Sequence, residues 1–259
     1  MLTRLIYPLS LREKVSYRLQ KLFPNVNDRN ISVEFNKQLK FDLSKTDVGH
    51  QSIIFNGYYE LELSKTMVRL GKEEGGVMVD VGANYGYFSC LWAAQKAGNR
   101  VYAFEASPLN LEPLRNNIRK NELQTQVEVL PIAIGKEKGI LKFDLATDKQ
   151  QTGWGGFTIG DTKNSVEVAV ERLDDYTTEH GIEKISVLKI DTEGADTWVL
   201  YGAKQLLQEK RIKHIFFEHN PTRMKLLNIR LNEAEAFLKG LGYRVEQRSA
   251  VDFYAYPKG

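Results

Sequence analysis

The amino-acid sequence predicts an α/β fold built on a doubly wound, mostly parallel sheet with helices on both faces. From residue 77 onward, short apolar runs alternate with segments whose apolar residues recur at helical spacing. Such alternation is typical of βαβ units, in which parallel strands are joined through a helix. The last two apolar runs, 243–247 and 252–257, are separated only by a short turn. We therefore expect them to pair antiparallel at one edge of the sheet.

Each predicted element of this domain shows its own pattern. Near-continuous apolar runs, which several times end in a polar residue, predict strands at VMVDV (77–81), VYAFE (101–105), VEVLPIAIG (127–135), ISVLKID (185–191) and IKHIFFEH (212–219). Apolar stripes at helical spacing predict helices at YFSCLWAAQKA (87–97), LNLEPLRNNIRKN (109–121), WVLYGAKQLLQ (198–208) and NEAEAFLKGLG (232–242).

A glycine-rich segment interrupts this alternation. The runs 141–145 and 166–170 alternate as half-buried strands do, and the loop between them holds Trp154 and Phe157 among four glycines. Loops of that length inside a compact domain are often functional. The segment is interpreted either as a hinged lid whose rings stack on an acceptor, or as a hairpin loop whose aromatics cover the edge of the core.

Composition limits the class of protein. The chain has 259 residues, 42% of them hydrophobic, which suits one domain with a small extension. A net charge of +3 is too balanced for a nucleic-acid surface, so no nucleic-acid partner is expected. Cys90 is the only cysteine, which excludes an internal disulfide and suggests a reducing, cytoplasmic compartment. No apolar run reaches the length of a transmembrane helix.

Residues 1–55 are interpreted as a helical and hairpin extension ahead of a domain that spans 56–259. The first 23 residues mix apolar side chains with five basic ones. They predict a basic amphipathic helix that touches a membrane or a lipid-linked substrate, a helix packed on the domain, or a frayed arm. The run 31–43 alternates around a polar break and predicts a β-hairpin. The run 52–63, SIIFNGYYELEL, is rich in β-type residues and is expected to be extended.

The stretch VMVDVGANYGYFSC, residues 77–90, is the first candidate binding site. A strand runs into a glycine-bearing turn that opens a helix, which is where open parallel sheets bind ligands. Gly82 and Gly86 lack a Cβ and are expected to let the backbone approach a ligand closely. Asp80, at the end of the strand, is expected either to accept a hydrogen bond from an ammonium group or to hold the loop.

Glu105 ends the next strand, 23 residues after Gly82. A carboxylate at about that distance holds the ribose hydroxyls of a nucleotide-like ligand and repels a ribose 2′-phosphate. The run GANYG has only two glycines, with the bulky Asn84 and Tyr85 between them, so it fits a ligand without a pyrophosphate. The sequence therefore predicts an adenosine-like ligand with a free ribose.

The arrangement D-x-G-x-N-x-G at residues 80–86 resembles motif I of class I S-adenosylmethionine-dependent methyltransferases. LKIDTEGADTWVLYGA (188–203), VGANYGYFS, FEASPLNLEPLRNNIRKN and FFEHN are similar to blocks of the FkbM-like family in that class. The resemblance covers about residues 55–220. It implies a Rossmann-like, seven-stranded sheet, S-adenosylmethionine as cofactor, and O-methylation of a sugar, glycolipid or natural-product acceptor. The residues assigned to the cofactor are Asp80, Gly82, Asn84, Gly86, Glu105, Ala106 and Asp191.

Methyl transfer to a hydroxyl needs aligned reactants and a group that takes the proton. Among polar residues at the carboxyl ends of the fourth and fifth strands, Asp191, Glu218 and His219 are assigned to catalysis. Asp191 directly follows an apolar strand, and an unperturbed histidine titrates near neutrality. Glu193 is interpreted as either a functional acid or a cap of the next helix. These four residues also offer ligands for Mg²⁺, but no metal is assigned.

The resemblance also implies that Tyr58, Tyr59 and Glu60 lie in a strand that closes the cofactor site from the other side. Two other classes stay open from the residues alone. A nucleotide-dependent oxidoreductase is disfavoured by the missing third glycine, and a non-catalytic cofactor-binding module is disfavoured by the intact acidic motifs. The expected partner is a small-molecule or glycan acceptor.

Overall fold

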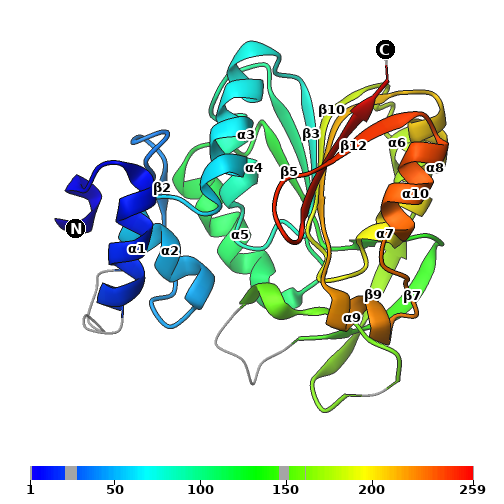
Figure 1. The fold of residues 1–259 in the computed structure, drawn as a ribbon, viewed down its shortest axis with the longest axis horizontal. Coiled ribbons are helices and arrows are strands. Elements are labelled where there is room, and N and C mark those ends of the chain that lie inside the picture. Colours follow the sequence, from blue (N-terminus) through cyan, green and yellow to red (C-terminus); the bar gives the residue numbers. More distant parts are fainter. Residues whose placement is uncertain (1, 21–27, 146–151, 161, 259) are drawn as a thin grey trace.

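The computed structural model describes residues 2–20, 28–145, 152–160 and 162–258, and its centre is a seven-stranded sheet (Figure 1). In spatial order the strands are β12 (Tyr243–Gln247), β13 (Asp252–Pro257), β11 (Ile212–Glu218), β10 (Ile185–Ile190), β3 (Val77–Val81), β4 (Arg100–Phe104) and β5 (Val127–Leu130). The strands from β11 to β5 run parallel, whereas β13 pairs antiparallel with both β11 and β12. The predicted α/β class and the antiparallel edge are confirmed.

Helices cover both faces of this sheet (Figure 1). One face carries α3 (Leu61–Glu73), α4 (Tyr87–Ala93) and α5 (Pro108–Lys120), and the other carries α6 (Leu173–Glu179), α7 (Asp196–Gly202), α8 (Lys204–Gln208) and α10 (Glu233–Gly240). Successive strand residues alternate between the two cores, so that Met78 packs on the first face and Val79 on the second. Because both faces are buried, the strands read in the sequence as near-continuous apolar runs.

The strand order places a topological switch point between β3 and β10. The chain moves from β3 outward to β4 and β5, and it later returns on the other side of β3 as β10 and β11. Ligands of open α/β sheets bind outside the carboxyl ends of the strands at such a point. The residues that follow β3, β4, β10 and β11 therefore surround the expected site.

A second sheet of four strands packs beside α9 (Pro221–Leu226). Its strands, in spatial order, are β6 (Ala133–Ile134), β9 (Ser165–Glu171), β7 (Gly139–Asp144) and β8 (Gly156–Phe157), and the 3₁₀ helix η2 (Thr152–Trp154) precedes β8. The predicted strand 127–135 is divided into β5 and β6 around Pro131, which has no N–H for a ladder. The runs 141–145 and 166–170 form most of β7 and β9, which pair antiparallel. Residues 146–151 of the predicted lid lie outside the described residues.

The N-terminal extension is mostly helical. It contains the 3₁₀ helix η1 (Leu2–Leu5), α1 (Leu9–Gln20), α2 (Val48–Asn56) and one antiparallel pair, β1 (Ile31–Ser32) with β2 (Lys40–Phe41). The hairpin prediction is confirmed in this short form. The prediction of extended structure for 52–63 is wrong, because this run holds the end of α2 and the start of α3. Asp47 caps α2 by accepting the His50 N–H, and Gly57 ends it with a φ of 89°.

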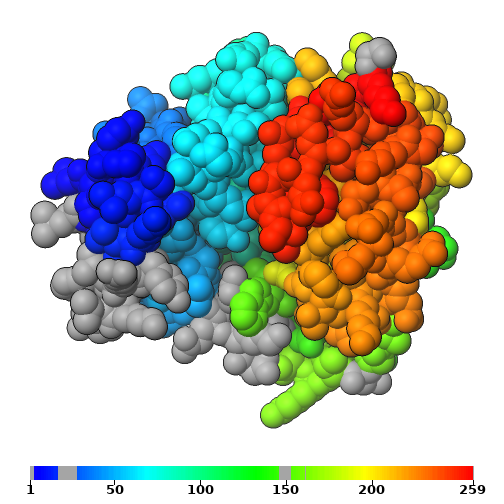
Figure 2. Space-filling model, viewed as in Figure 1, coloured from blue at the N-terminus to red at the C-terminus, as the bar shows by residue number. Residues whose placement is uncertain are grey.

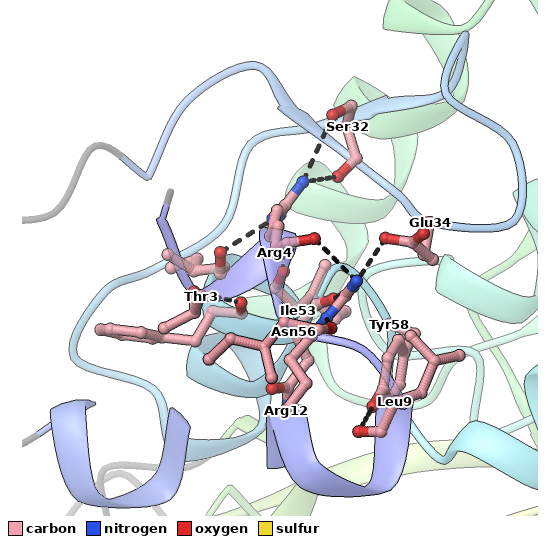
Figure 3. Close-up of polar contacts among 12 residues, drawn as sticks. Thr3, Arg4, Leu9, Arg12, Ser32, Glu34, Ile53, Asn56 and Tyr58 are labelled. Carbon is pink, nitrogen blue, oxygen red and sulfur yellow. Dashed lines mark hydrogen bonds and ion pairs between the residues drawn. The ribbon is translucent and has the colours of Figure 1, made fainter. Parts of the chain in front are cut away.

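Two arginines tie the N-terminal arm to the rest of the extension (Figure 3). Arg12 lies 2.7 Å from a carboxylate oxygen of Glu34 and donates to the carbonyl of Asn56 at 2.8 Å. Arg4 donates to three backbone carbonyls. These two basic side chains therefore point inward, as the packed-helix interpretation predicts, whereas Lys14 is exposed. The other two basic side chains of the arm lie outside the described part, and membrane contact stays a prediction.

The extension forms one end of the molecule. Figure 2 shows it in blue, packed directly against the cyan segment that contains α3. Its residues Val33, Phe41 and Ile53 belong to the same hydrophobic core as Met67 of α3 and Leu91 of α4. In the part of the chain that the structure describes, no helix combines the length and the apolar character needed to cross a membrane.

Candidate active site

The turn after β3 is hydrogen-bonded to the strands on both sides. The N–H of Gly82 donates to the Phe104 carbonyl at 2.9 Å, and the N–H of Asp191 donates to the Val81 carbonyl at 3.0 Å. Gly82 has a φ of 79°, and a Cβ there would lie 1.9 Å from the carbonyl oxygen of Asp191. Glycine is thus needed here because the backbone of Asp191 passes very close to it. The sequence predicted only the close approach of a ligand.

Gly86 and Asn84, the other two assigned residues of this turn, have different roles. Gly86 is the N-cap of α4, and a Cβ there would lie 2.5 Å from Leu114 of α5. It lines neither of the two cavities described below, so the structure shows a packing role, and its assignment to the cofactor stays a prediction. Asn84 lines both cavities, with a φ of 51° that asparagine tolerates better than most residues.

Asp80 is buried and already paired. Its Oδ1 lies 3.2 Å from Lys189 Nζ, and its Oδ2 accepts a hydrogen bond from Ser89 Oγ at 2.6 Å. Lys189 stands opposite Asp80 in the register of β10 and β3, so the sheet itself brings the two charges together. Lys189 also donates to the carbonyl of Gly82 at 3.3 Å. Of the two predicted roles for Asp80, holding the loop fits its burial and its two partners, while a contact with a ligand's ammonium group stays a prediction.

Glu105 follows β4, and its carboxylate faces the turn. One oxygen accepts the N–H of Asn84 and the other accepts the N–H of Ser107, both at 2.7 Å. The side chain of Asn110 also hydrogen-bonds to this carboxylate, so of its roughly four acceptor positions about one is left for a ribose hydroxyl. Burial raises the pKa of Glu105 to about 7, although the amides of Ser107 and Asn84 act in the opposite direction.

A first cavity, with about 580 Å³ of empty space, lies between the turn, the end of β4 and the second sheet. Glu105 and Asn110 contribute polar groups, and apolar side chains such as Ile132 and Phe157 form its walls. Ala106, which the sequence assigns to the cofactor, also lines it. An apolar slot that ends in a carboxylate suits a flat base between the walls and hydroxyl groups at the acid.

A second cavity, with about 630 Å³ of empty space, adjoins the first over the ends of β3 and β10. Gly82, Asn84, Gly153 and Asp191 line both of them. Asp191 therefore lies at the junction, where a residue that faces the reacting groups is expected. The rest of the second cavity is lined mainly by aromatic and acidic side chains.

Three carboxyl groups converge at the rim of the second cavity. Asp191, Glu193 and Glu218 each place an oxygen within 4.8 Å of the others. Burial, and then the charge of Asp191, raises the pKa of Glu218 to about 10 and that of Glu193 to about 7. Glu193 accepts from Asn220 at 2.7 Å, and because Ala195 is the N-cap of α7, the capping interpretation is not supported. The three oxygens are close enough to ligate a divalent cation once Glu218 loses its proton.

His219 points away from this rim. Its Nε2 lies 3.0 Å from a carboxylate oxygen of Glu235 on α10, and its ring packs 4.3 Å from that of Phe253, between centroids. Successive side chains of an extended segment face opposite sides, so His219 turns away where Glu218 lines the cavity. The structure therefore does not bring His219 to the rim beside Asp191 and Glu218, and this arrangement does not support its assignment as a catalytic base.

Lys189, which the sequence analysis did not select, is the central cation of the site. It is 4% exposed, and its Nζ lies 3.2 Å from Asp80 and 3.6 Å from Asp191. Burial alone lowers the pKa of Lys189, but the charges of Asp80, Asp191 and Glu60 raise it above its ordinary value. One feature of the sequence could have identified Lys189: it is a single lysine in the apolar run ISVLKI. A strand buried on both faces rarely holds an unpaired charge.

Asp196 was also missed, and no sequence pattern marks it, whereas Glu60 was expected near the cofactor site from the resemblance. Asp196 is 2% exposed and accepts the N–H groups of Thr192 at 3.0 Å and Glu218 at 2.9 Å, so it joins the segments after β10 and β11. Glu60 precedes α3 in a loop, not in the expected strand. Burial, followed by the charge of Asp191, raises its pKa to about 7.

The aromatic residues selected from the sequence lie in different places. Tyr59 lines the second cavity, whereas Tyr58 faces the extension and its hydroxyl donates to the Leu9 carbonyl at 3.0 Å. Phe157 is 7% exposed in β8 and lines the first cavity, so it both covers the core and faces the ligand space. Trp154 is 42% exposed and lines neither cavity.

Comparison with known proteins defines the class to which this fold and site belong. A family model described as "Methyltransferase FkbM domain" matches residues 80–245, which is more than half of the chain. The protein is therefore a methyltransferase, and the oxidoreductase and non-catalytic alternatives are set aside. More narrowly, the chain belongs to the FkbM methyltransferase family, as its motifs predicted.

The individual proteins to which this chain is similar share less than 30% of its sequence. The 31-O-demethyl-FK506 methyltransferase FkbM of Streptomyces tacrolimicus is 28% identical over 218 residues, which cover 73% of this chain and 81% of that protein. The 2-O-methyltransferase NoeI of Sinorhizobium fredii is 24% identical over 166 residues, which cover 58% and 67%. The solved O-methyltransferase from Bacillus cereus in complex with SAH is 14% identical with a TM-score of 0.42, covering 78% of this chain and 82% of that one.

Proposed function

We propose that this protein is an S-adenosylmethionine-dependent O-methyltransferase that acts on a hydroxyl of a sugar, glycolipid or natural-product acceptor. The observation that carries the proposal is the pair of adjoining cavities, with Asp191 at their junction and Glu105 in the first. The names of two relatives, a 31-O-demethyl-FK506 methyltransferase and a 2-O-methyltransferase, support oxygen as the methylated atom.

The residues of the first cavity suit this cofactor. Beside its hydrogen bonds to the N–H groups of Asn84 and Ser107 and to the Asn110 side chain, the Glu105 carboxylate can accept from a ribose hydroxyl, and its charge disfavours a phosphorylated ribose. The apolar walls around Ile132 and Phe157 suit an adenine ring. When bound, the cofactor supplies a methyl group on a sulfonium centre, which an acceptor oxygen displaces in line.

Two carboxyl groups at the rim have different parts in this proposal. Asp191 lies at the junction with 31% of its side chain exposed, so an acceptor hydroxyl can reach it and transfer its proton there. Glu218, whose pKa is raised to about 10 by burial and by Asp191, is protonated at neutral pH. A protonated carboxyl donates a hydrogen bond, so Glu218 is assigned to orienting the acceptor oxygen and not to taking the proton.

The proposal is tested by cofactor binding and by methyl transfer. S-adenosylhomocysteine is titrated calorimetrically into the wild type, Glu105→Ala and Glu105→Gln, with Glu112→Ala, an exposed acid on α5, as the matched control. Loss of charge-assisted hydrogen bonds is expected to weaken binding roughly ten- to hundredfold in Glu105→Ala, and less in Glu105→Gln. Equal affinity in all variants would contradict the ribose assignment. A panel of hydroxylated acceptors with methyl-labelled cofactor then reports turnover.

A further inference from the structure

The second cavity has a wall that the family-matched domain does not supply. Asp47 and Gly49, at the start of α2, and Tyr59, in the loop after it, line one side, and all three precede residue 80, where the family match begins. The other side consists of the turn after β3 and the residues that follow β10 and β11. The cavity is thus enclosed between the N-terminal extension and the methyltransferase core.

This wall is held in place by contacts between the N-terminal arm and residues 56–58 (Figure 3). Arg12 donates to the Asn56 carbonyl at 2.8 Å, and the hydroxyl of Tyr58 donates to the Leu9 carbonyl at 3.0 Å. Arg12 and Tyr58 are 3% and 1% exposed, so both bonds are shielded from water. Because they hold the chain immediately before Tyr59, the wall is preformed and does not require a bound acceptor for its position.

The charge inside the second cavity is unbalanced. Four carboxyl groups line it, of which that of Glu218 is neutral near pH 7 because its pKa is raised to about 10, and among the described lining residues Lys189 is the one cation. Lys189 is already engaged by Asp80 and Asp191 at 3.2 and 3.6 Å. An anion that enters would therefore lose its hydration without gaining a free cationic partner. The four carboxyl groups belong to Asp47, Asp191, Glu193 and Glu218.

Aromatic rings form much of the remaining surface. Tyr59, Tyr85, Tyr87 and Phe88 line the cavity, and the ring centroids of Tyr59 and Phe88 lie 6.2 Å apart. Such rings pack against the apolar faces of a cyclic compound and attract cations through their π faces. Rings beside carboxyl groups thus suit a compound that carries several hydroxyls, with or without an ammonium group.

We propose that the second cavity is the acceptor chamber, that the N-terminal extension forms its outer wall, and that it selects uncharged or positively charged hydroxyl compounds over anionic ones. The inference rests on the proposed function in naming the occupant an acceptor. The wall and the charge preference are properties of the cavity and are testable without a known acceptor.

The test uses the single, fully buried Cys90 of the wild type as a silent background. Gly49→Cys places a thiol in the wall, where a Cβ lies 3.3 Å from Asp47 Oδ1, a contact that a small adjustment relieves. Gly240→Cys, at the end of α10 with nothing within 4 Å, is the matched control. Each variant is treated with methanethiosulfonates that carry either a trimethylammonium or a sulfonate group, and the modification rates are measured. Because both reagents modify the same thiol, the ratio of their rates does not depend on the intrinsic reactivity of that thiol.

We expect the cation-to-anion rate ratio at residue 49 to exceed that at residue 240 at least about tenfold at low salt, because a cavity lined by one sign of charge concentrates the opposite sign. Equal ratios, or no modification at residue 49 in a variant that keeps wild-type circular dichroism, would overturn the inference. S-adenosylhomocysteine binding to the unmodified variant is measured separately, so its absence reports failure of the proposed function alone. Methyl glucoside, glucosaminide and glucuronide then serve as matched acceptors, and efficient methylation of the glucuronide would also overturn the charge preference.

Discussion

At the scale of single residues, Lys189 organises the acidic end of the sheet. Its ammonium group lies between Asp80 on β3 and Asp191 after β10, and it also donates to the Gly82 carbonyl in the turn. A buried ion pair is weak evidence for stability, because both groups lose their hydration. Its effect here is on position, because it fixes the turn after β3 and Asp191, at the junction of the two cavities, relative to each other.

The pair makes a double-mutant cycle informative. Lys189→Met leaves Asp80 buried without its partner, and we expect it to lower the free energy of unfolding by roughly 3 to 5 kcal/mol. Lys189→Met combined with Asp80→Asn removes the unpaired charge and should recover part of that loss. Urea denaturation of the wild type, both single variants and the double variant measures the coupling. Additive effects of the two substitutions would show that the contact has no energetic consequence.

The assignment of roles at the rim gives a second prediction at this scale. We expect Asp191→Asn to lower the rate of methyl transfer by about 10²- to 10⁴-fold, since the acceptor proton loses its receiver. S-adenosylhomocysteine affinity should change far less. Initial rates with labelled cofactor measure the effect, and His219→Gln is the control, because that ring faces Glu235 and not the cavity. A larger loss in the His219 variant than in the Asp191 variant, at equal folded fraction, would reverse the assignment.

At the scale of elements, the sequence predicts well wherever burial alone decides the structure. The parallel strands are near-continuous apolar runs because helices cover both faces, and Glu105 lies where strand length and motif spacing place it. The extended structure predicted for residues 52–63 is wrong because the cap at Asp47 and the left-handed Gly57 define a helix there, despite β-type side chains such as Ile53 and Ile54. The direction of His219 and the pairing of Asp80 depend on register and on distant strands, which a local pattern does not encode.

The turn after β3 gives the prediction at this scale. Gly82→Ala places a Cβ against the Asp191 carbonyl, in a backbone conformation that L-residues rarely adopt, and the contact is with backbone that cannot rotate away. We expect a loss of about 3 kcal/mol or more in stability, together with weaker cofactor binding, since the ends of β3 and β10 must separate. Gly98→Ala, where a Cβ would meet nothing within 4 Å, is the control. Chemical denaturation and calorimetry of both variants check this, and similar stabilities would contradict the close approach.

At the scale of the whole molecule, the net charge is nearly balanced, but several acidic side chains lie together at one end of the main sheet. The sequence has 36 basic and 33 acidic residues. Burial raises the pKa of Glu60, Glu105 and Glu193 to about 7 each, and all three lie around the ends of β3, β4 and β10. A raised pKa means that the folded protein binds protons that the unfolded chain has released. Ionisation of these glutamates above neutral pH therefore lowers the stability of the folded protein, and a bound cationic ligand would offset that loss.

The raised pKa values of these glutamates predict how the stability of the protein depends on pH. Between the ordinary glutamate pKa near 4.5 and about 7, the folded state holds more protons than the unfolded state, so the free energy of unfolding falls as pH rises through that window. Glu193→Gln keeps an acceptor for Asn220 but cannot ionise, so it should escape its share of the loss. We expect its stability relative to the wild type to improve from pH 5 to pH 8 by up to roughly 3 kcal/mol. Urea denaturation of both proteins at the two pH values measures the difference, and a gap that stays constant or narrows would show that Glu193 is not protonated in the folded protein near neutrality.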